Sequence, residues 1–252
     1  MWQSRHLTRS IPGGMIPPNM GSTAPPVFFN KEQAANYDGR FRKLAPMQDA
    51  LHLLTSAVLA ELPEEARILC VGAGTGAEIM ALAERFPGWH FTAVEPAGAM
   101  LDVFRGKAAE AGIAERCSFH EGYLESLPET EPFHAATSFL VSQFLLTAQA
   151  RRGFFEGISN RLLPGGCLVS TDLSSDRASG DYQELFSAWV RLQAATGIPL
   201  ENLEKLREVY GRDVAVSTPH YVEAIISSAG FGKPVQFYQS LLIRGWFARR
   251  AS

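Results

Sequence analysis

Short apolar segments alternate with helical segments along residues 67–172, and this alternation restricts the fold more than any other feature of the chain. Apolar, partly β-branched runs predict five strands, at residues 67–71, 90–95, 116–121, 134–139 and 167–172. Helices are expected between them, at residues 77–86, 97–111, 142–149 and 149–163. Nearly continuous apolar strands joined by helices form a parallel sheet covered on both faces, because right-handed crossovers place the helices there. The sequence therefore predicts a doubly wound α/β fold.

The segments before residue 67 predict a terminal arm followed by helices. Residues 1–30 contain no acidic side chain and two proline pairs, so we expect a disordered arm there. From residue 31 to residue 62 the apolar side chains recur at helical spacing, with a break at Pro46. We expect one α/β domain over residues 31–252 that opens with two helices.

The alternation stops after the fifth expected strand, where residues 173–215 predict an insertion of two helices joined at residues 197–199. A further helix is expected from Pro219, capped by Ser217 or Thr218, to Gly230. Two closing strands follow, in the runs PVQFYQS and LLIRGWFA, and are close enough in sequence to form an antiparallel hairpin.

Composition and charge exclude several classes of protein. The chain has 252 residues, 46% of them hydrophobic, and a formal net charge of −3. This excludes disorder, collagen and a disulfide scaffold, and no general attraction to nucleic acid or an anionic membrane is expected. We expect no membrane span, because no stretch reaches the ~18 apolar residues required.

The three cysteines and six histidines predict no metal site. Cys70, Cys117 and Cys167 each lie in an apolar run and are expected to be small buried side chains in a reducing, cytoplasmic setting. The histidines show no regular ligand spacing, so we expect no metal.

A glycine-rich turn joins the first expected strand to the helix after it and carries the chemistry. It comprises Gly72, Ala73, Gly74, Thr75 and Gly76. The turn lets a ligand approach the backbone, and the following helix offers free N–H groups to acceptor oxygens.

The second expected strand ends in a carboxylate, Glu95, nineteen residues after Gly76. A carboxylate at this place can accept hydrogen bonds from both ribose hydroxyls of a nucleotide. The glycines alone also fit the relaxed dinucleotide fingerprint Gly72-x-Gly74-x-x-Ala77. However, a nicotinamide-dependent enzyme would have a second nucleotide-binding half where this chain has an insertion and a hairpin.

Four short motifs, in this order, make residues 31–249 resemble the class I S-adenosylmethionine-dependent methyltransferases. The motifs are residues 71–76, Glu95-Pro96, Gly122 with Leu127-Pro128, and residues 162–166. The resemblance implies a Rossmann-like, seven-stranded sheet that ends in an antiparallel hairpin. It also implies S-adenosylmethionine as the cofactor and S-adenosylhomocysteine as the product.

The resemblance also implies a set of cofactor-binding residues. Gly72, Ala73, Gly74, Thr75 and Gly76 would border the methionine moiety, and Glu95 would bind the ribose. The adenine would be flanked by Pro96 and Met100 and bordered by Gly122, Tyr123 and Leu124. Tyr123 stands where many members carry an aspartate, and its phenol or the Leu124 backbone would replace that group.

Further positions would contact the cofactor or face the acceptor. Tyr37, in AANYDGRF, matches a Tyr-Asp pair that many relatives place over the cofactor as a lid. Phe139, Leu140 and Val141, at the end of the fourth expected strand, would lie under the cofactor on the substrate side.

Methyl transfer from a sulfonium depends mainly on orientation of the two reactants. If the acceptor is a hydroxyl or thiol, a general base assists, and Asp172 at the carboxyl end of the fifth strand is the candidate. The alternative for Asp172 is a strand-end cap. Arg177, Tyr182 and Trp189 in the insertion are candidates to cover the substrate.

The sequence predicts a cytoplasmic S-adenosylmethionine-dependent methyltransferase acting on a small molecule. One alternative is a tRNA wobble-uridine enzyme that uses carboxy-S-adenosylmethionine, with Arg177 or Arg191 binding the extra carboxylate; nucleic acid is therefore a possible but not favoured partner. Another is a non-catalytic binding module. The aromatic hairpin or the insertion would serve as the contact of a homodimer, and the acceptor stays unnamed.

Overall fold

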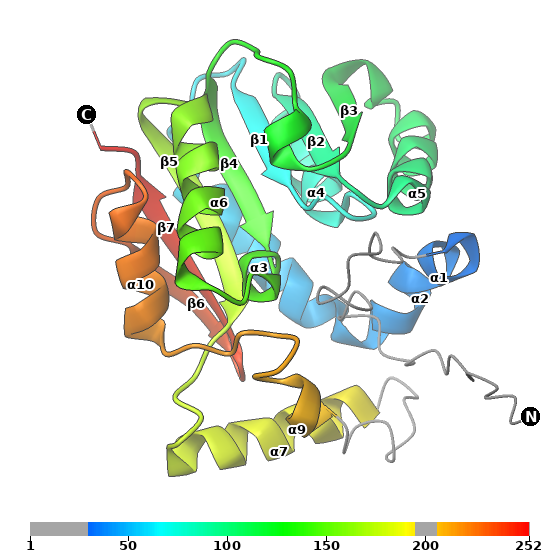
Figure 1. The fold of residues 1–252 in the computed structure, drawn as a ribbon. Coiled ribbons are helices and arrows are strands. Elements are labelled where there is room, and N and C mark those ends of the chain that lie inside the picture. Colours follow the sequence, from blue (N-terminus) through cyan, green and yellow to red (C-terminus); the bar gives the residue numbers. More distant parts are fainter. Residues whose placement is uncertain (1–29, 195–205, 252) are drawn as a thin grey trace, which may run out of the picture.

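A computed structural model describes residues 30–194 and 206–251 and has a single seven-stranded sheet at its centre (Figure 1). The strand order is β3-β2-β1-β4-β5-β7-β6. β7 is antiparallel to β5 and β6, and the remaining neighbours are parallel. The strands are β1 (Arg67–Val71), β2 (His90–Glu95), β3 (Cys117–Glu121), β4 (Phe133–Phe139), β5 (Leu162–Leu173), β6 (Val235–Ser240) and β7 (Ile243–Arg249). The predicted doubly wound seven-stranded sheet with a C-terminal hairpin is confirmed.

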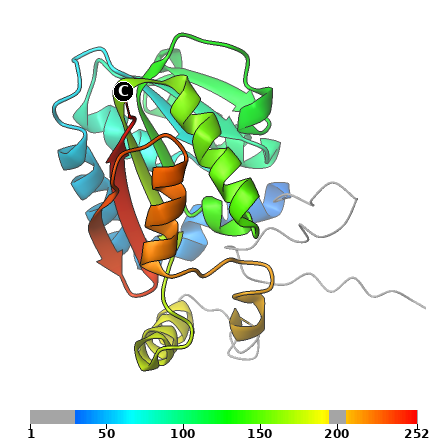
Figure 2. The same ribbon diagram turned by 60° about the vertical axis from the view of Figure 1, so that its left-hand side comes forward.

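Helices cover both faces of this sheet, as Figures 1 and 2 show. The helices that follow strands or border the sheet are α3 (Ala45–Val58), α4 (Ala77–Arg85), α5 (Gly98–Glu110), α6 (Ala148–Arg161) and α10 (Pro219–Ser228). The Thr218 side chain caps α10 by accepting a hydrogen bond from the Tyr221 N–H, as its sequence signal predicts.

The alternation of side chains along the strands produces two separate cores. Ile68 and Cys70 of β1 pack with α4 and α5 on one face, in a core that also holds Phe104. Leu69 and Val71 point to the other face and pack with α6 and α10. Successive strand residues face opposite sides of a sheet, so a run of apolar residues without alternation is what a sheet covered on both faces requires.

Two expected elements differ from the structure around β4 and β5. β5 begins at Leu162, five residues before the predicted start, because Leu162 already pairs with Phe133 of β4, ahead of an irregularity after which regular pairing resumes at Cys167. The helix predicted at residues 142–149 is wrong: only a 3-10 turn, η4 (Ser142–Phe144), forms there. The buried Ser142 and Gln143 side chains bond to the end of β5 instead.

The N-terminal residues form short helices that lie beside α5. α1 (Lys31–Ala35) begins with a capping box between Asn30 and Gln33. α2 (Tyr37–Phe41) and a 3-10 turn, η1 (Arg42–Leu44), lead into α3. Pro46 lies in the first turn of α3, where its missing N–H costs nothing. The predicted disordered arm lies outside the described residues except for Asn30.

The insertion after β5 forms a third cluster with the hairpin. Its described helices are α7 (Gly180–Ala194) and α9 (Leu206–Val209). Tyr182, Phe186 and Trp189 of α7 pack with Tyr210 and the β6–β7 turn, and the Trp189 indole donates a hydrogen bond to the Tyr210 hydroxyl (2.9 Å). The helix joint expected at residues 197–199 lies outside the described residues, and the boundaries 173–215 stay a prediction.

Cys70 and Cys167 are buried, Cys117 is partly exposed, and all three are free. Within residues 30–194 and 206–251, no helix has the length and apolar character to cross a bilayer.

Candidate functional site

A cavity of about 720 Å³ opens where β1, β2 and β4 end at their carboxyl edge. Open α/β sheets bind ligands at this edge, where the strand order reverses. Nearly all the cofactor and acceptor positions expected from the sequence line the cavity: Tyr37, Gly72, Ala73, Gly74, Thr75, Glu95, Pro96, Met100, Gly122, Tyr123, Leu124, Phe139, Leu140 and Val141. Residues from several separate segments of the chain therefore surround one space.

The glycine turn forms the floor of this cavity and requires glycine at its ends. Gly72 and Gly76 have φ angles of +77° and +76°, in the left-handed region that costs other residues energy. A Cβ at Gly72 would overlap the Val141 side chain, and one at Gly76 would overlap the Phe104 ring. Gly76 does not line the cavity itself; it forms the start of α4 beneath it.

Glu95 joins the glycine turn to the end of β2. One carboxylate oxygen accepts a hydrogen bond from Gly74 N–H (3.0 Å) and the other accepts from Ala97 N–H (2.9 Å). Burial raises the pKa of Glu95, and these two backbone hydrogen bonds oppose that rise. Each carboxylate oxygen has capacity for a second donor, so Glu95 can hold the turn and still accept from a ligand.

The charged groups that line the cavity are acidic. They are Glu78, Glu95 and Glu125, and no lysine or arginine of the described chain lines it. Burial raises the pKa of Glu78 to about 7, opposed by its own backbone N–H and by Lys107. The sequence did not single out Glu78, because one charged residue in the first turn of a helix carries no distinctive signal.

The N-terminal helices are fastened over the glycine turn. The Thr75 hydroxyl donates to the Asp38 carboxylate (2.6 Å), whose other oxygen pairs with Lys107 of α5 (2.9 Å). Tyr37, the adjacent residue, lines the cavity, and burial raises its pKa to about 12. Tyr37 was the predicted site residue of this Tyr-Asp pair, yet Asp38 is the residue that bonds to the turn.

The other half of the cavity lies between α3, the end of β4 and the β6–β7 hairpin. Apolar side chains dominate it, and they are Leu44, Met47, Leu51, Phe144, Leu145, Phe154 and Ile243. His52 of α3 also lines this half, with its ring nearly parallel to Phe139 (centroids 6.3 Å apart, planes at 16°). His52 was not among the residues singled out from the sequence, because the helical pattern of α3 shows only that a histidine lies near its buried face.

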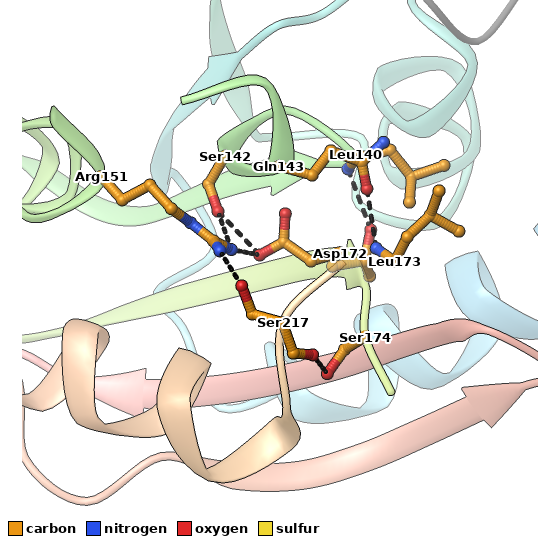
Figure 3. A network of polar contacts seen from close by, with 9 residues as sticks. Leu140, Ser142, Gln143, Arg151, Asp172, Leu173, Ser174 and Ser217 are labelled. Carbon is orange, nitrogen blue, oxygen red and sulfur yellow. Dashed lines mark hydrogen bonds and ion pairs between the residues drawn. The ribbon is translucent and has the colours of Figure 1, made fainter. Parts of the chain in front are cut away.

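Asp172 does not line the cavity; it is the centre of a buried polar network beside it (Figure 3). One of its oxygens accepts from the Ser142 hydroxyl (2.7 Å) and from Arg151 (3.1 Å). Arg151 also donates to Ser142 and Ser217. Burial raises the pKa of Asp172, and Arg151 and Ser142 oppose the rise. With both side chains at most 1% exposed, the carboxylate is not in contact with the space where an acceptor would lie.

Hydrogen bonds next to this network determine the path of the loop that follows β4. The Leu140 N–H donates to the Thr171 carbonyl (2.8 Å), and the Gln143 side chain accepts from Leu173 N–H (2.7 Å). They hold Leu140 at a φ of +58°, a conformation that a bulky residue adopts only when its surroundings impose it. Through its hydrogen bond with Ser142, Asp172 is joined to the same loop, which carries Leu140 and Val141 of the cavity wall.

The structure places the insertion candidates away from the cavity. Tyr182 is buried against Phe186 in the third cluster. Arg177 borders a second, smaller cavity of about 320 Å³ with Arg151 and Tyr221, and Arg191 is exposed on α7. Within the described part of the insertion no residue lines the first cavity, and its role as a substrate cover stays a prediction. The described residues also include no group of three or more potential metal ligands.

Comparison with known proteins agrees with this geometry. Residues 68–166 match the model of a family described as methyltransferase domain. The chain is 29% identical over 205 residues to the malonyl-(acyl-carrier protein) O-methyltransferase of Geobacter sulfurreducens, a match covering 79% of this chain and 66% of that protein. It is 30% identical over 190 residues to the biotin biosynthesis bifunctional protein BioHC of Teredinibacter turnerae, covering 69% of this chain but 32% of that protein.

A solved structure shows the same fold. A protein from Nostoc punctiforme described as a putative O-methyltransferase has a TM-score of 0.62 and 16% identity, covering 87% of this chain and 60% of that one. At this identity the likeness concerns the fold alone. The family match covers residues 68–166, which hold the glycine turn and Glu95.

Proposed function

We propose that the protein is an S-adenosylmethionine-dependent methyltransferase that produces S-adenosylhomocysteine. The observation that carries the proposal is the acidic cavity at the glycine turn. S-adenosylmethionine has a positive sulfonium and a positive ammonium group, which the carboxylates of Glu95 and Glu125 attract, and Glu78 adds to this attraction in its ionised form. A dinucleotide would place its negative pyrophosphate against the same carboxylates, which disfavours nicotinamide cofactors.

The residues divide into groups with distinct roles toward this cofactor. Glu95 accepts from the ribose hydroxyls, and Gly72–Gly74 border the methionine portion. Pro96, Met100 and Leu124 supply apolar contacts for the adenine, and Tyr37 closes the site from the N-terminal side. When bound, the cofactor supplies an activated methyl group; the chain's contribution is to orient it and to exclude water.

The acceptor is a small molecule held in the half of the cavity beside α3 and β6–β7. Phe139, Leu140 and Val141, at the end of β4, line the same cavity as the glycine turn, and an acceptor held beside them would lie next to the cofactor. Arg177 and Arg191 lie away from the cavity, and none of the arginine side chains that the structure describes lines it, so the described geometry gives no support for a carboxylated cofactor or the tRNA wobble-uridine alternative. The non-catalytic module remains the competing proposal.

Ligand-dependent thermal stability tests the proposal. At 100 times its dissociation constant a ligand stabilises a protein by about 2.7 kcal/mol, so S-adenosylhomocysteine is expected to raise the melting temperature of the purified protein and NAD to leave it unchanged. Glu95→Gln should remove most of the shift, because the amide replaces one of the two acceptor oxygens by a donor and can no longer accept from both ribose hydroxyls. Glu110→Gln, at an exposed position on α5, is the matched control and should keep it.

The outcomes separate the alternatives. Stabilisation by NAD and not by S-adenosylhomocysteine would contradict the proposal. Binding of S-adenosylhomocysteine without transfer of radiolabelled methyl groups to any acceptor in a cell extract would favour the non-catalytic module. A full shift in Glu95→Gln would overturn the ribose assignment alone.

A further inference from the structure

The acceptor half of the cavity contains no cationic side chain among the residues that the structure describes. An acceptor with a free carboxylate would be buried there without a counter-charge, at a large cost in free energy. Apolar and aromatic side chains, among them Met47, Leu51 and Phe144, surround the space instead. This surface fits an uncharged, apolar molecule, and aromatic rings pack well against such side chains.

Three other polar side chains of this half, Tyr238, Thr171 and Gln143, have hydrogen-bond partners, and Gln48, which also lines the cavity, is an amide that takes up no proton at neutral pH. The Tyr238 hydroxyl donates to the Met47 carbonyl (3.0 Å). The Thr171 hydroxyl accepts from Leu140 N–H (3.1 Å), and the Gln143 amide oxygen accepts from Leu173 N–H. These contacts orient the side chains for structural roles, which leaves few groups able to take a proton from an acceptor.

His52 differs from them. Its ring lies against Phe139, the last residue of β4. His52 is therefore close to the strand end that borders the cofactor half, the part of the cavity beside the glycine turn. No described residue hydrogen-bonds to either ring nitrogen, as far as residues 30–194 and 206–251 extend. Burial lowers the pKa of His52 and Asp49 on the same helix opposes this, so the imidazole is neutral at pH 7 and carries a lone pair.

From this placement we infer that His52 is the general base for an apolar acceptor with a hydroxyl group, most simply a phenol. The inference rests on the proposed methyltransferase function. In the step, a His52 ring nitrogen takes the hydroxyl proton while an oxygen lone pair forms the new bond to the methyl carbon. The bond from that carbon to sulfur breaks, its electron pair stays on sulfur, and the sulfonium becomes a neutral thioether. The imidazolium then releases the proton to water.

Phenols of different acidity test the role of His52. Methyl transfer from radiolabelled S-adenosylmethionine is measured at pH 8 with 4-methylphenol, whose hydroxyl is largely protonated, and with 4-nitrophenol, which is largely ionised and whose phenolate oxygen would face the positive sulfonium. General-base catalysis contributes roughly 100- to 10,000-fold. His52→Gln should therefore lose activity in that range with 4-methylphenol and less than about tenfold with 4-nitrophenol. His52→Asn is measured alongside it.

The controls separate catalysis from folding. His90→Gln, at an exposed position where β2 begins, at the opposite edge of the sheet, should keep both activities. Both His52 variants should retain the thermal shift with S-adenosylhomocysteine, because His52 lies outside the cofactor half.

Three results would overturn the inference. Equal losses with both phenols would assign His52 a structural role. Methylation of malonyl thioesters in preference to phenols, or no phenol methylated while S-adenosylhomocysteine still stabilises the protein, would reject the acceptor class and leave the proposed function intact. A protein that does not bind S-adenosylhomocysteine at all would reject both.

Discussion

Glu78 and Glu95 illustrate how the same side chain behaves differently according to its hydrogen bonds. Both line the cavity, and burial raises the pKa of each. Glu95 accepts from two backbone N–H groups on different segments, whereas the backbone hydrogen bond of Glu78 comes from its own residue. Glu78 therefore has less compensation for its lost hydration and titrates close to neutral pH.

This difference predicts a pH-dependent stability. The folded-state pKa of Glu78, about 7, lies above its ordinary value of 4.5, so the folded state holds the proton more tightly than the unfolded state does. The contribution of Glu78 to the free energy of unfolding is thus fully present below pH 4.5 and is lost as the pH rises to about 7, by roughly 3 kcal/mol at most.

Urea denaturation of Glu78→Gln at pH 5 and pH 8 measures that loss. The variant should gain stability relative to the wild-type protein between the two pH values, whereas Glu110→Gln should follow the wild type. If the stability of Glu78→Gln changed with pH as much as that of the wild-type protein, a group other than Glu78 would be responsible for the change.

Gly76 provides a second prediction for a single residue. Gly76→Ala combines a left-handed backbone with overlap between the new Cβ and the Phe104 ring, and we expect a destabilisation of about 2 to 5 kcal/mol. Gly112→Ala is the matched control, because Gly112 has a similar φ of +69° but a Cβ added there would meet nothing within 4 Å. Gly112→Ala should lower the free energy of unfolding by about 1 kcal/mol. Similar midpoints of urea unfolding for the two variants would contradict the role of the Phe104 overlap.

At the scale of elements, the Asp172 network connects parts of the chain that are distant in sequence. Asp172 belongs to β5, Ser142 to η4 and Arg151 to α6, while Ser217 precedes α10. Ser174 reinforces this connection, because its hydroxyl donates to the Ser217 carbonyl (2.8 Å). The network therefore determines how the loop after β4 turns, and with it the position of Leu140 and Val141 in the cavity wall.

Removing one member of the buried Arg151–Asp172 ion pair should lower the free energy of unfolding. Arg151→Met leaves the Asp172 carboxylate buried without its partner, and we expect a loss of about 3 to 5 kcal/mol in the free energy of unfolding. Arg152→Met changes the neighbouring, exposed ion pair with Glu156 and should cost less than about 1 kcal/mol.

The double variant Arg151→Met with Asp172→Leu should recover much of the loss, because it removes both charges. Chemical denaturation of the three variants checks this. A double variant no more stable than Arg151→Met would show that the hydroxyl partners, rather than the charge pair, determine the cost.

At the scale of the whole molecule, the sequence was sufficient to predict the sheet, because the residues that mark the strands and their ends lie within or next to each strand. β1 and β2 match the expected residues in full, since their ends are marked by the glycine turn and by Glu95. The glycine turn and Glu95 followed from the same local signals. The resemblance added Pro96, Met100, residues 122–124, the end of β4 and Tyr37.

The parts that were not predicted depend on contacts between distant residues. The turn at residues 142–144 replaces a helix because Ser142 and Gln143 bond to residues thirty positions later. Asp172 was a candidate for catalysis because the sequence does not show that Arg151 neutralises it. His52 reaches the cavity only when α3 packs beside the hairpin, and no local pattern reveals that.

The position of β7 in the sheet has a consequence for biosynthesis. β7 lies between β5 and β6 although it comes after both in the chain. In a nascent polypeptide shorter than 243 residues, β5 therefore has one edge of backbone N–H and carbonyl groups with no strand beside it, and such edges promote association between chains. That edge of β5 can be closed only after residue 249 has been synthesised, so the β5–β7 pairing forms later than the parallel pairings of β1 to β5 can.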